Sequence, residues 1–386
     1  MLHLEALADA PSLTPKQLAA KHGDEAARWA LMQFDLRKRA TKKYGDLAED
    51  MLFEREALEQ ASSFAVARYH ASQFPQDALV IDLTAGLGGD ALALAARGPL
   101  IAYENDPTRA ELLEFNLLRL QNLGSTGIPE REVRVADGTQ ALLEPLTPNS
   151  QLSTPSYYWT DPDRRSATGR RLTKPEDYTP NPGDLAAKLK DSKLAGIKLS
   201  PLLPDDYLES LCESHNGSLE FISHHGECLE AIIWLGTENK KPKRQAVILH
   251  PNHQPTRIEA TSNPPLQAAH PERYIHDCDP AVVRAHCLGT FGLFQLGDSP
   301  GYLTSDDPNP NLAYRTYEVL GSPTKNQLKA KLQQLNARVF ELKQRGTNHD
   351  PVKLLKEIKT NGDRPISLIA FRSGNSIRYV LTERLR

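Results

Sequence analysis

A short stretch near residue 80 limits the fold more than any other part of the chain. Residues 79–81 form an apolar run that ends in Asp82. A glycine-dense segment, 86–89, comes next, and an alanine- and leucine-rich run at 91–96 follows it. This order predicts a strand, a tight turn and a helix, which is the opening unit of a doubly wound α/β sheet. Because glycines let the backbone approach a ligand closely, the turn is also a candidate binding site.

Two classes of ligand suit such a turn, a dinucleotide and S-adenosylmethionine (SAM). A dinucleotide site requires Gly-x-Gly-x-x-Gly, and the segment 86–89 lacks the last spacing. Asp82 would repel a pyrophosphate at the end of the strand, whereas it would attract a ligand with an ammonium or sulfonium group. The residues therefore favour SAM over a dinucleotide, and a glycine turn that binds no ligand is the remaining alternative.

Two further acids stand at the ends of the next two expected strands. Glu104 ends the strand 100–104, and Asp137 follows the strand 133–136. Ligands of open α/β sheets bind at the carboxyl ends of the strands. A carboxylate at Glu104 can accept both ribose hydroxyls of a nucleoside, and one at Asp137 can accept a hydrogen bond from the adenine amine. Together with Asp82 they predict one adenosyl pocket, although a helix-capping acid and an ordinary Asp-Gly turn would explain them without a ligand.

The other candidate cofactor contacts lie close to these acids in the sequence. They are in the glycine turn, directly after the second and third acids, and on the helix before the first strand: Thr84, Gly86, Gly88, Gly89, Asn105, Gly138, Gln60 and Ser62. Asp90 is favoured as an acid in the first turn of the next helix, with a ligand contact as the alternative.

The fourth expected strand ends in Asp161-Pro162, which we expect at the methyl-acceptor site. Asp161 can orient an amine or a hydroxyl. Arg164 with Arg165 can clamp a phosphate, with ion pairs to nearby acids such as Asp163 as the alternative. Lys198, near the end of the fifth strand, is a second candidate for an acceptor or phosphate contact, with an ion-paired lysine as the alternative. The candidate catalytic residues are therefore Asp161, Pro162, Arg164 and Lys198.

The pattern of elements divides the chain into four expected domains. They are an N-terminal helical domain at 1–75, an α/β domain at 76–262, a small α+β (ferredoxin-like) domain at 263–322 and a basic domain at 323–386. The turn-like residues 236–243 separate two expected strands, 231–235 and 246–250, and predict an antiparallel hairpin at one edge of the sheet. The prolines between 251 and 271 predict an irregular connection.

Charge is distributed unevenly along the chain. The net charge is −3, but residues 323–386 contain 14 Lys or Arg against 5 Asp or Glu. Such asymmetry suggests a basic module that binds nucleic acid, with a solvated basic surface as the alternative.

Other function classes find little support in the sequence. No apolar run approaches the roughly 20 residues that span a bilayer, and the first residues lack the pattern of a secretory signal. The four cysteines form no Cys-x-x-Cys pair, and His224-His225 with Cys228 lack metal-ligand spacing. We therefore expect a cytoplasmic protein without a metal.

The motifs resemble those of a known family. Asp82-Leu-Thr-Ala-Gly-Leu-Gly-Gly-Asp90, Tyr103-Glu-Asn-Asp-Pro107, Ala136-Asp-Gly138 and Asp161-Pro-Asp-Arg-Arg165 are similar to motifs I to IV of class I SAM-dependent methyltransferases. The first two also resemble the trimethylguanosine synthase branch. Nearly the whole chain resembles bacterial methyltransferases with a C-terminal THUMP-like domain.

The resemblance implies a Rossmann-like seven-stranded methyltransferase sheet, SAM as the cofactor, and an RNA substrate recruited by the THUMP-like module. It leaves the methylated atom (N, O or C) open. A small-molecule methyltransferase and a non-catalytic protein that binds SAM or RNA are the alternative functions.

Overall fold

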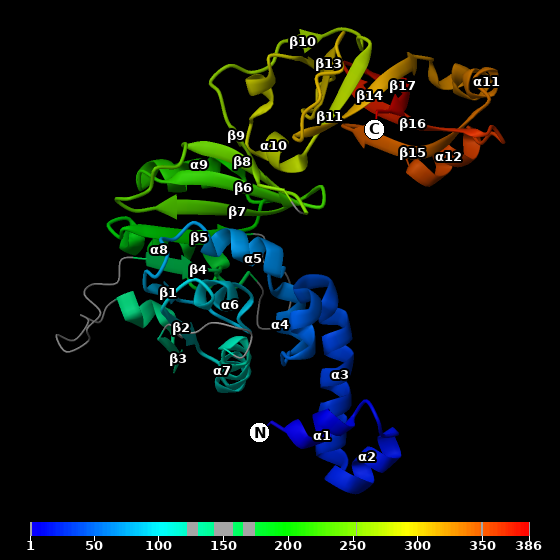
Figure 1. Ribbon diagram of the computed structural model, residues 1–386. Helices are drawn as coiled ribbons and strands as arrows, with labels where there is room; N and C mark the ends of the chain where they lie inside the picture. Colours follow the sequence, from blue (N-terminus) through cyan, green and yellow to red (C-terminus); the bar gives the residue numbers. More distant parts are fainter. Residues whose placement is uncertain are drawn as a thin grey trace. The chain divides into compact units, whose positions relative to one another are not determined.

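The computed structural model describes residues 2–121, 130–142, 157–164, 174–251, 253–348 and 350–385. The chain divides into two compact units, whose elements are labelled in Figure 1. The first unit comprises Met1–Leu199, Leu203–Gly217 and Ile233–Lys240, and the second comprises Ser200–Leu202, Ser218–Ile232 and Lys241–Arg386.

Helices fill the chain before the first strand. They are α1 (Leu4–Asp9), α2 (Pro15–His22), α3 (Asp24–Tyr44), the 3₁₀ turn η1 (Gly45–Glu49), α4 (Arg55–Gln60) and α5 (Phe64–Ala71). The start of α2 follows from its sequence, because the Thr14 hydroxyl accepts the Gln17 N–H in a capping box and Pro15 occupies the first helical position.

A nine-stranded sheet has the order β3-β2-β1-β4-β5-β7-β6-β8-β9 among the described residues. Its strands are β1 (Val80–Asp82), β2 (Leu100–Glu104), β3 (Arg131–Val135), β4 (Tyr157–Thr160), β5 (Leu194–Leu199), β6 (Ser218–His224), β7 (Glu227–Leu235), β8 (Arg244–Leu249) and β9 (Thr256–Glu259). β1 to β5 pair in parallel, so their carboxyl ends lie at one edge of the sheet.

Helices connect the parallel strands, as expected for βαβ units. They are α6 (Gly89–Ala95), α7 (Pro107–Gln121), α8 (Pro182–Leu189) and α9 (Asp205–Ser214), with short 3₁₀ turns η2 (Gly138–Leu142) and η3 (Pro175–Asp177). α6 and α7 pack on β2, and α8 packs on β5. β1, β2 and β5 are buried along their whole length, which explains why their sequences are largely apolar and place their charged residues at or near the carboxyl ends.

The prediction of a hairpin formed by residues 231–235 and 246–250 is wrong. β6 pairs in parallel with β8, and the antiparallel partner of β8 is β9. The reason is a tight turn after β6, where His225 and Gly226 have φ of 54° and 80° and bring β7 back beside β6. The described sheet therefore has nine strands rather than seven, and β9 lies where the prolines predicted an irregular connection.

The second unit contains an eight-stranded sheet with the order β10-β12-β13-β11-β14-β17-β16-β15. Its strands are β10 (Gln267–Ala268), β11 (Tyr274–Cys278), β12 (Phe294–Leu296), β13 (Tyr302–Ser305), β14 (Tyr314–Gly321), β15 (Ala337–Arg345), β16 (Arg364–Ser373) and β17 (Ser376–Arg384). Its helical elements are α10 (Pro280–Arg284), η4 (Leu288–Phe291), η5 (Lys325–Gln327), α11 (Leu328–Gln334) and α12 (Pro351–Glu357). β14 pairs with β17, so residues on both sides of the expected boundary at 322 contribute to one sheet.

α11 and α12 cover the same face of this sheet. Leu328, Leu332, Leu354 and Ile358 from the helices and their termini share one apolar core with residues of β16 and β17. In the described part of the chain, no helix combines the length and apolar character that a membrane crossing requires.

Candidate active site

A cavity of about 830 Å³ opens at the carboxyl ends of β1, β2 and β4 in the first unit. Thirteen of the fifteen predicted site residues line it, from the end of α4 to the segment after β4: Gln60, Ser62, Asp82, Thr84, Gly86, Gly89, Glu104, Asn105, Asp137, Gly138, Asp161, Pro162 and Arg164. Gln60 and Ser62 were expected on the helix just before the first strand, but Gln60 ends α4 and Ser62 lies between α4 and α5. The structure thus brings the three predicted acids together. Gly88 and Lys198 are absent from the lining.

The glycine turn follows from backbone conformation. Gly86 and Gly88 have φ of 56° and 95°, in the region that residues with a side chain rarely adopt. At Gly138 the constraint is space, since a Cβ atom there would lie 2.1 Å from the Leu83 carbonyl oxygen. These glycines let two loops meet at the end of β1.

Asp82 ends β1 as a buried carboxyl, with 1% of its surface exposed. Its Oδ1 accepts the Thr84 N–H at 3.1 Å. Burial raises the pKa of Asp82 well above its usual value, and the nearby acids act in the same direction. The carboxyl therefore holds its proton more firmly than an ordinary aspartic acid, and a cation in the cavity would favour its ionised form.

Glu104 and Asp137 use one oxygen each to hold the turn that follows them. Glu104 Oε1 accepts the Asp106 N–H at 2.9 Å and lies 3.8 Å from Arg109 Nη1. Asp137 Oδ1 accepts both the N–H and the hydroxyl of Thr139, at 2.9 Å each. These turns fix the two carboxyl groups on the cavity wall.

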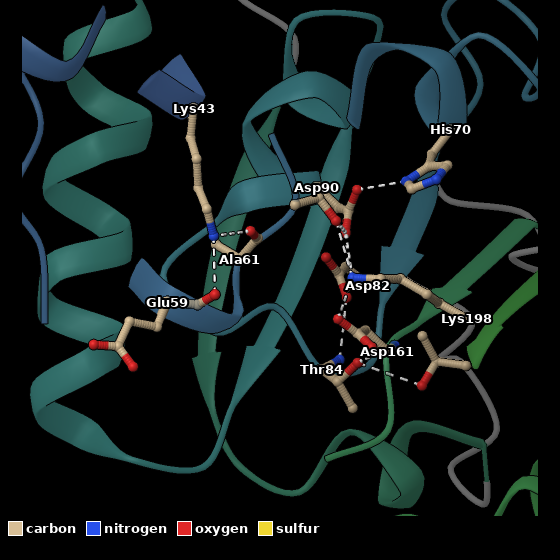
Figure 2. A network of polar contacts seen from close by, with 11 residues as sticks. Lys43, Glu59, Ala61, His70, Asp82, Thr84, Asp90, Asp161 and Lys198 are labelled. Carbon is tan, nitrogen blue, oxygen red and sulfur yellow. Dashed lines mark hydrogen bonds and ion pairs between the residues drawn. The ribbon is translucent and has the colours of Figure 1, made fainter. Parts of the chain in front are cut away.

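The segment at the end of α4 forms another wall of the cavity, and Lys43 of α3 holds it. Lys43 Nζ donates to the carbonyl oxygens of Leu58, Glu59 and Ala61 at 2.8, 2.9 and 2.7 Å (Figure 2). Burial lowers the pKa of Lys43 to about 8. No sequence signal identified this lysine, because its partners are backbone atoms 15 to 18 residues away.

Asp161 is fixed through both its backbone and its side chain. Its N–H donates to Thr84 Oγ1 at 2.6 Å, and its Oδ2 lies 2.6 Å from Lys198 Nζ. Burial raises the pKa of Asp161 even though Lys198 opposes the shift. Asp161 faces the cavity with 35% of its side chain exposed, whereas Lys198 lies behind it as a buried ion-pair partner.

Behind Lys198 lies a buried pair that the sequence did not indicate as part of the site. His70 of α5 and Asp90 of α6 are joined by a 2.7 Å contact between Nδ1 and Oδ1 (Figure 2). Asp90 also lines the cavity. The sequence favoured a place in the first turn of a helix over a ligand contact for Asp90, and nothing in the sequence links it to a histidine 20 residues earlier.

The segment after β4 is tied down by the backbone. Asp163 exchanges two backbone hydrogen bonds with Thr179, at 2.8 and 3.1 Å. This bridge holds Arg164 at the cavity wall. Arg165 lies outside the described residues.

His224, His225 and Cys228 do not form a metal site within the described structure. The two imidazole rings lie 3.9 Å apart, and burial raises the pKa of Cys228 to about 12. Among the residues described, no group of three or more His, Cys, Asp or Glu side chains is placed to hold a metal ion.

Comparison with known proteins gives relatives over almost the full chain. An uncharacterised SAM-dependent methyltransferase of Mycobacterium tuberculosis, from strains CDC 1551 and H37Rv, is 30% identical over 372 residues, covering 92% of this chain and 96% of the relative. The crystal structure of a proposed methyltransferase from Porphyromonas gingivalis W83 matches with a TM-score of 0.81 and 20% identity, over 100% of this chain and 98% of that one. No family model matches the chain.

Proposed function

Because this chain belongs to the SAM-dependent methyltransferases, we propose that the cavity at the ends of β1, β2 and β4 is its donor and acceptor site. The observation that carries the proposal is the meeting of Asp82, Glu104, Asp137 and Asp161 in the lining of one cavity. Bound SAM supplies a methyl group activated by a positively charged sulfur. The residues below provide binding, charge and alignment.

The adenosine half of the cofactor is assigned to Glu104 and Asp137. Glu104 accepts the ribose hydroxyls, because its buried carboxylate ends β2 and is held by the Asp106 N–H. Asp137 accepts the adenine amine from the neighbouring turn after β3. Hydrogen bonds to charged groups contribute about 1.5–3 kcal/mol each, so these two carboxylates account for much of the affinity.

The methionine half is assigned to the opposite wall. Asp82 offers a carboxylate to its positive groups, while Gln60 and Ser62 offer polar side chains to its carboxylate. Lys43 supports this wall through the three carbonyl groups at the end of α4.

Asp161 receives the methyl acceptor. An ionised Oδ atom accepts a hydrogen bond from an N–H or O–H of the acceptor and turns its lone pair toward the methyl group. Since the thioether is a good leaving group, alignment is the main task, and good alignment supplies about 7–11 kcal/mol. Arg164 on the same wall is suited to a phosphate of the acceptor.

The charges of the C-terminal segment support an RNA acceptor. Several of its arginines and lysines are used internally, as Lys343 and Arg345 are by Asp277 at 2.7 and 3.0 Å. The exposed lysines on and directly after these helices differ, because within the described chain they make no ion pair: Lys329 of α11, Lys353 and Lys356 of α12, and Lys359 after α12. We call these four residues the lysine face.

The lysine face has the charge that an RNA backbone requires. We therefore propose that residues 323–386 act as a THUMP-like module that recruits RNA by its phosphates. The closing strands of this module share a sheet with β14. Removing the module would expose β14, so substitutions on the lysine face are a cleaner test than truncation.

Transfer of tritium from labelled SAM tests the proposed substrate class. The intact protein is incubated with total bacterial RNA and, separately, with a small-metabolite extract. We expect label in RNA with wild-type protein and none with Asp161→Asn. Label only in the metabolite extract would overturn the RNA assignment and leave a small-molecule methyltransferase.

A further inference from the structure

Four polar side chains form a chain of contacts that begins at the cavity and ends at a buried histidine: Asp161, Lys198, Asp90 and His70 (Figure 2). Lys198 Nζ lies 2.6 Å from Asp161 Oδ2, 2.9 Å from Ser62 Oγ and 4.0 Å from Asp90 Oδ2. One ammonium group therefore stands between two carboxylates. Only one of them, Asp161, is at hydrogen-bonding distance.

His70 explains why Lys198 contacts Asp161 more closely than Asp90. His70 is fully buried and stacks on Trp159 with ring centroids 4.5 Å apart, so its ring has little freedom to move. Its Nδ1 lies 2.7 Å from Asp90 Oδ1. Burial alone would raise the pKa of Asp90, but His70 and Lys198 outweigh it and lower that pKa, so Asp90 is ionised and the imidazole nitrogen is the donor.

We propose that His70 and Asp90 are positioning residues for methyl transfer. The hydrogen bond from His70 satisfies Asp90, so the Lys198 ammonium stays paired with Asp161 and holds it toward the acceptor. The inference rests on the proposed function, in which Asp161 receives the acceptor. It adds that the acceptor must carry an N–H or O–H, because an ionised Asp161 can only accept a hydrogen bond.

Several charged or titratable groups face the Asp161–Lys198 pair from the surrounding elements. They are Asp82 from β1, Asp90 from α6 with His70 behind it, Arg164 from the segment after β4, and Lys43 and Tyr44 from α3. Among these groups, Asp82 is a second carboxyl whose pKa is raised by burial. Its contribution is shared by all variants below, so the difference between variants reports on Asp161.

The arrangement predicts opposite effects for its two members. Without the donor at His70, Asp90 draws Lys198 toward itself, and Asp161 then requires a higher pH to ionise. Without the anion at Asp90, Lys198 loses the attraction of that carboxylate and Asp161 loses a repelling negative charge. Asp161 therefore ionises at lower pH.

The ratio of SAM affinity to S-adenosylhomocysteine affinity measures this ionisation without any acceptor. The two ligands differ by one positive charge at sulfur, so the ratio rises when a neighbouring carboxyl ionises. At an effective dielectric constant near 20, a charge some 8 Å away changes the ratio by about tenfold or more. We call the rise of this ratio with pH the step. Calorimetric titration of both ligands between pH 5 and 9 locates it.

We expect His70→Leu, which has no donor, to move the step to higher pH and Asp90→Asn to move it to lower pH. His70→Asn keeps a donor near the Nδ1 position and retains the wild-type step. Asp161→Asn removes the part of the rise that belongs to Asp161, and any rise that remains belongs to Asp82. Thermal melting of each variant confirms that it is folded.

The matched control is His22→Ala, because His22 also pairs with an aspartate, Asp9, at 2.6 Å but lies on α2. It should leave the step unchanged. The inference is overturned if His70→Leu and His70→Asn behave alike, if His70→Leu and Asp90→Asn move the step in one direction, or if the wild-type ratio has no step. Failure of RNA labelling would overturn only the RNA substrate, since this measurement uses no acceptor.

Discussion

The donor cavity and the lysine face use charged side chains in opposite ways. In the cavity, Asp82 and Lys198 are buried, and their neighbours and distances decide their charge. The four lysines of the lysine face are exposed to water and make no ion pair within the described chain. Chemistry in the cavity should therefore respond to pH and little to salt, whereas binding on the lysine face should respond to salt and little to pH.

The largest effect that separates the two regions is expected at Asp161. Asp161→Asn removes the negative charge that orients the acceptor but keeps the shape of the side chain. Methyl transfer to RNA should fall by roughly 10²–10³-fold, the usual effect of removing one precisely placed polar group, while SAM affinity falls by only about tenfold, the effect of one lost negative charge near the sulfonium. Single-turnover transfer and calorimetry measure the two quantities. An equal loss of both would place Asp161 in cofactor binding instead.

A combined change of Lys329, Lys353, Lys356 and Lys359 to glutamine should weaken RNA binding at 50 mM salt by about 100-fold and flatten the salt dependence, since each lost phosphate contact reduces the slope by about one. Filter binding at several salt concentrations gives the slope, and calorimetry should find SAM affinity unchanged. The matched control is Lys343→Gln, whose partner is Asp277. An unaltered salt dependence of RNA binding in the quadruple variant would overturn the proposal that these lysines recruit RNA.

Lys43→Met tests the wall at the end of α4. It leaves three carbonyl oxygens without their donor, so the segment with Gln60 and Ser62 loses its support. We expect SAM affinity to drop about tenfold, in line with about 1.5 kcal/mol for a hydrogen bond to a charged group. In wild type, affinity should also decline above pH 8, as the amine with its pKa of about 8 loses a proton. The variant should lack that decline.

A smaller effect is proton release at Asp82. Its pKa is raised by burial, so the free protein holds a proton there over a wider pH range, and a positive ligand favours the carboxylate. SAM binding should release up to about one proton and strengthen as pH rises through the pKa of Asp82. Calorimetry in two buffers of different ionisation enthalpy counts the protons. Asp82→Asn should release none, and proton uptake in wild type would reverse the assignment.

The sequence predicted the cavity better than what lies behind it. Asp82, Glu104 and Asp137 could be placed together because each ends a strand of a parallel sheet, and the carboxyl ends of such strands share one edge. The contact of Lys198 with Asp161 spans 37 residues and depends on side-chain direction, which no local pattern specifies. The same holds for His70 and Asp90.

The predicted strand pairing at the edge of the first sheet was wrong for a related reason. Gly236 and the residues after it suggested a hairpin turn, but the tight turn is at His225-Gly226. The apolar runs 219–223, 231–235 and 246–250 predict strands, and β6, β7 and β8 lie there. Strand order depends on which neighbours pair, and β6 pairs with β8. In the second sheet the apolar runs 366–371 and 377–381 on either side of Gly374-Asn375 predict a hairpin, and β16 and β17 form it.

Calorimetric titration of SAM into wild type, Glu104→Ala and the control Glu132→Ala decides whether the cavity is the cofactor site. Glu104 lines the cavity, whereas Glu132 is an exposed acid on β3 that pairs with Arg134. Loss of two hydrogen bonds to a carboxylate should cost Glu104→Ala about 100-fold in SAM affinity or more, with Glu132→Ala equal to wild type. Wild-type affinity in a folded Glu104→Ala protein would contradict the assignment of the cavity to SAM.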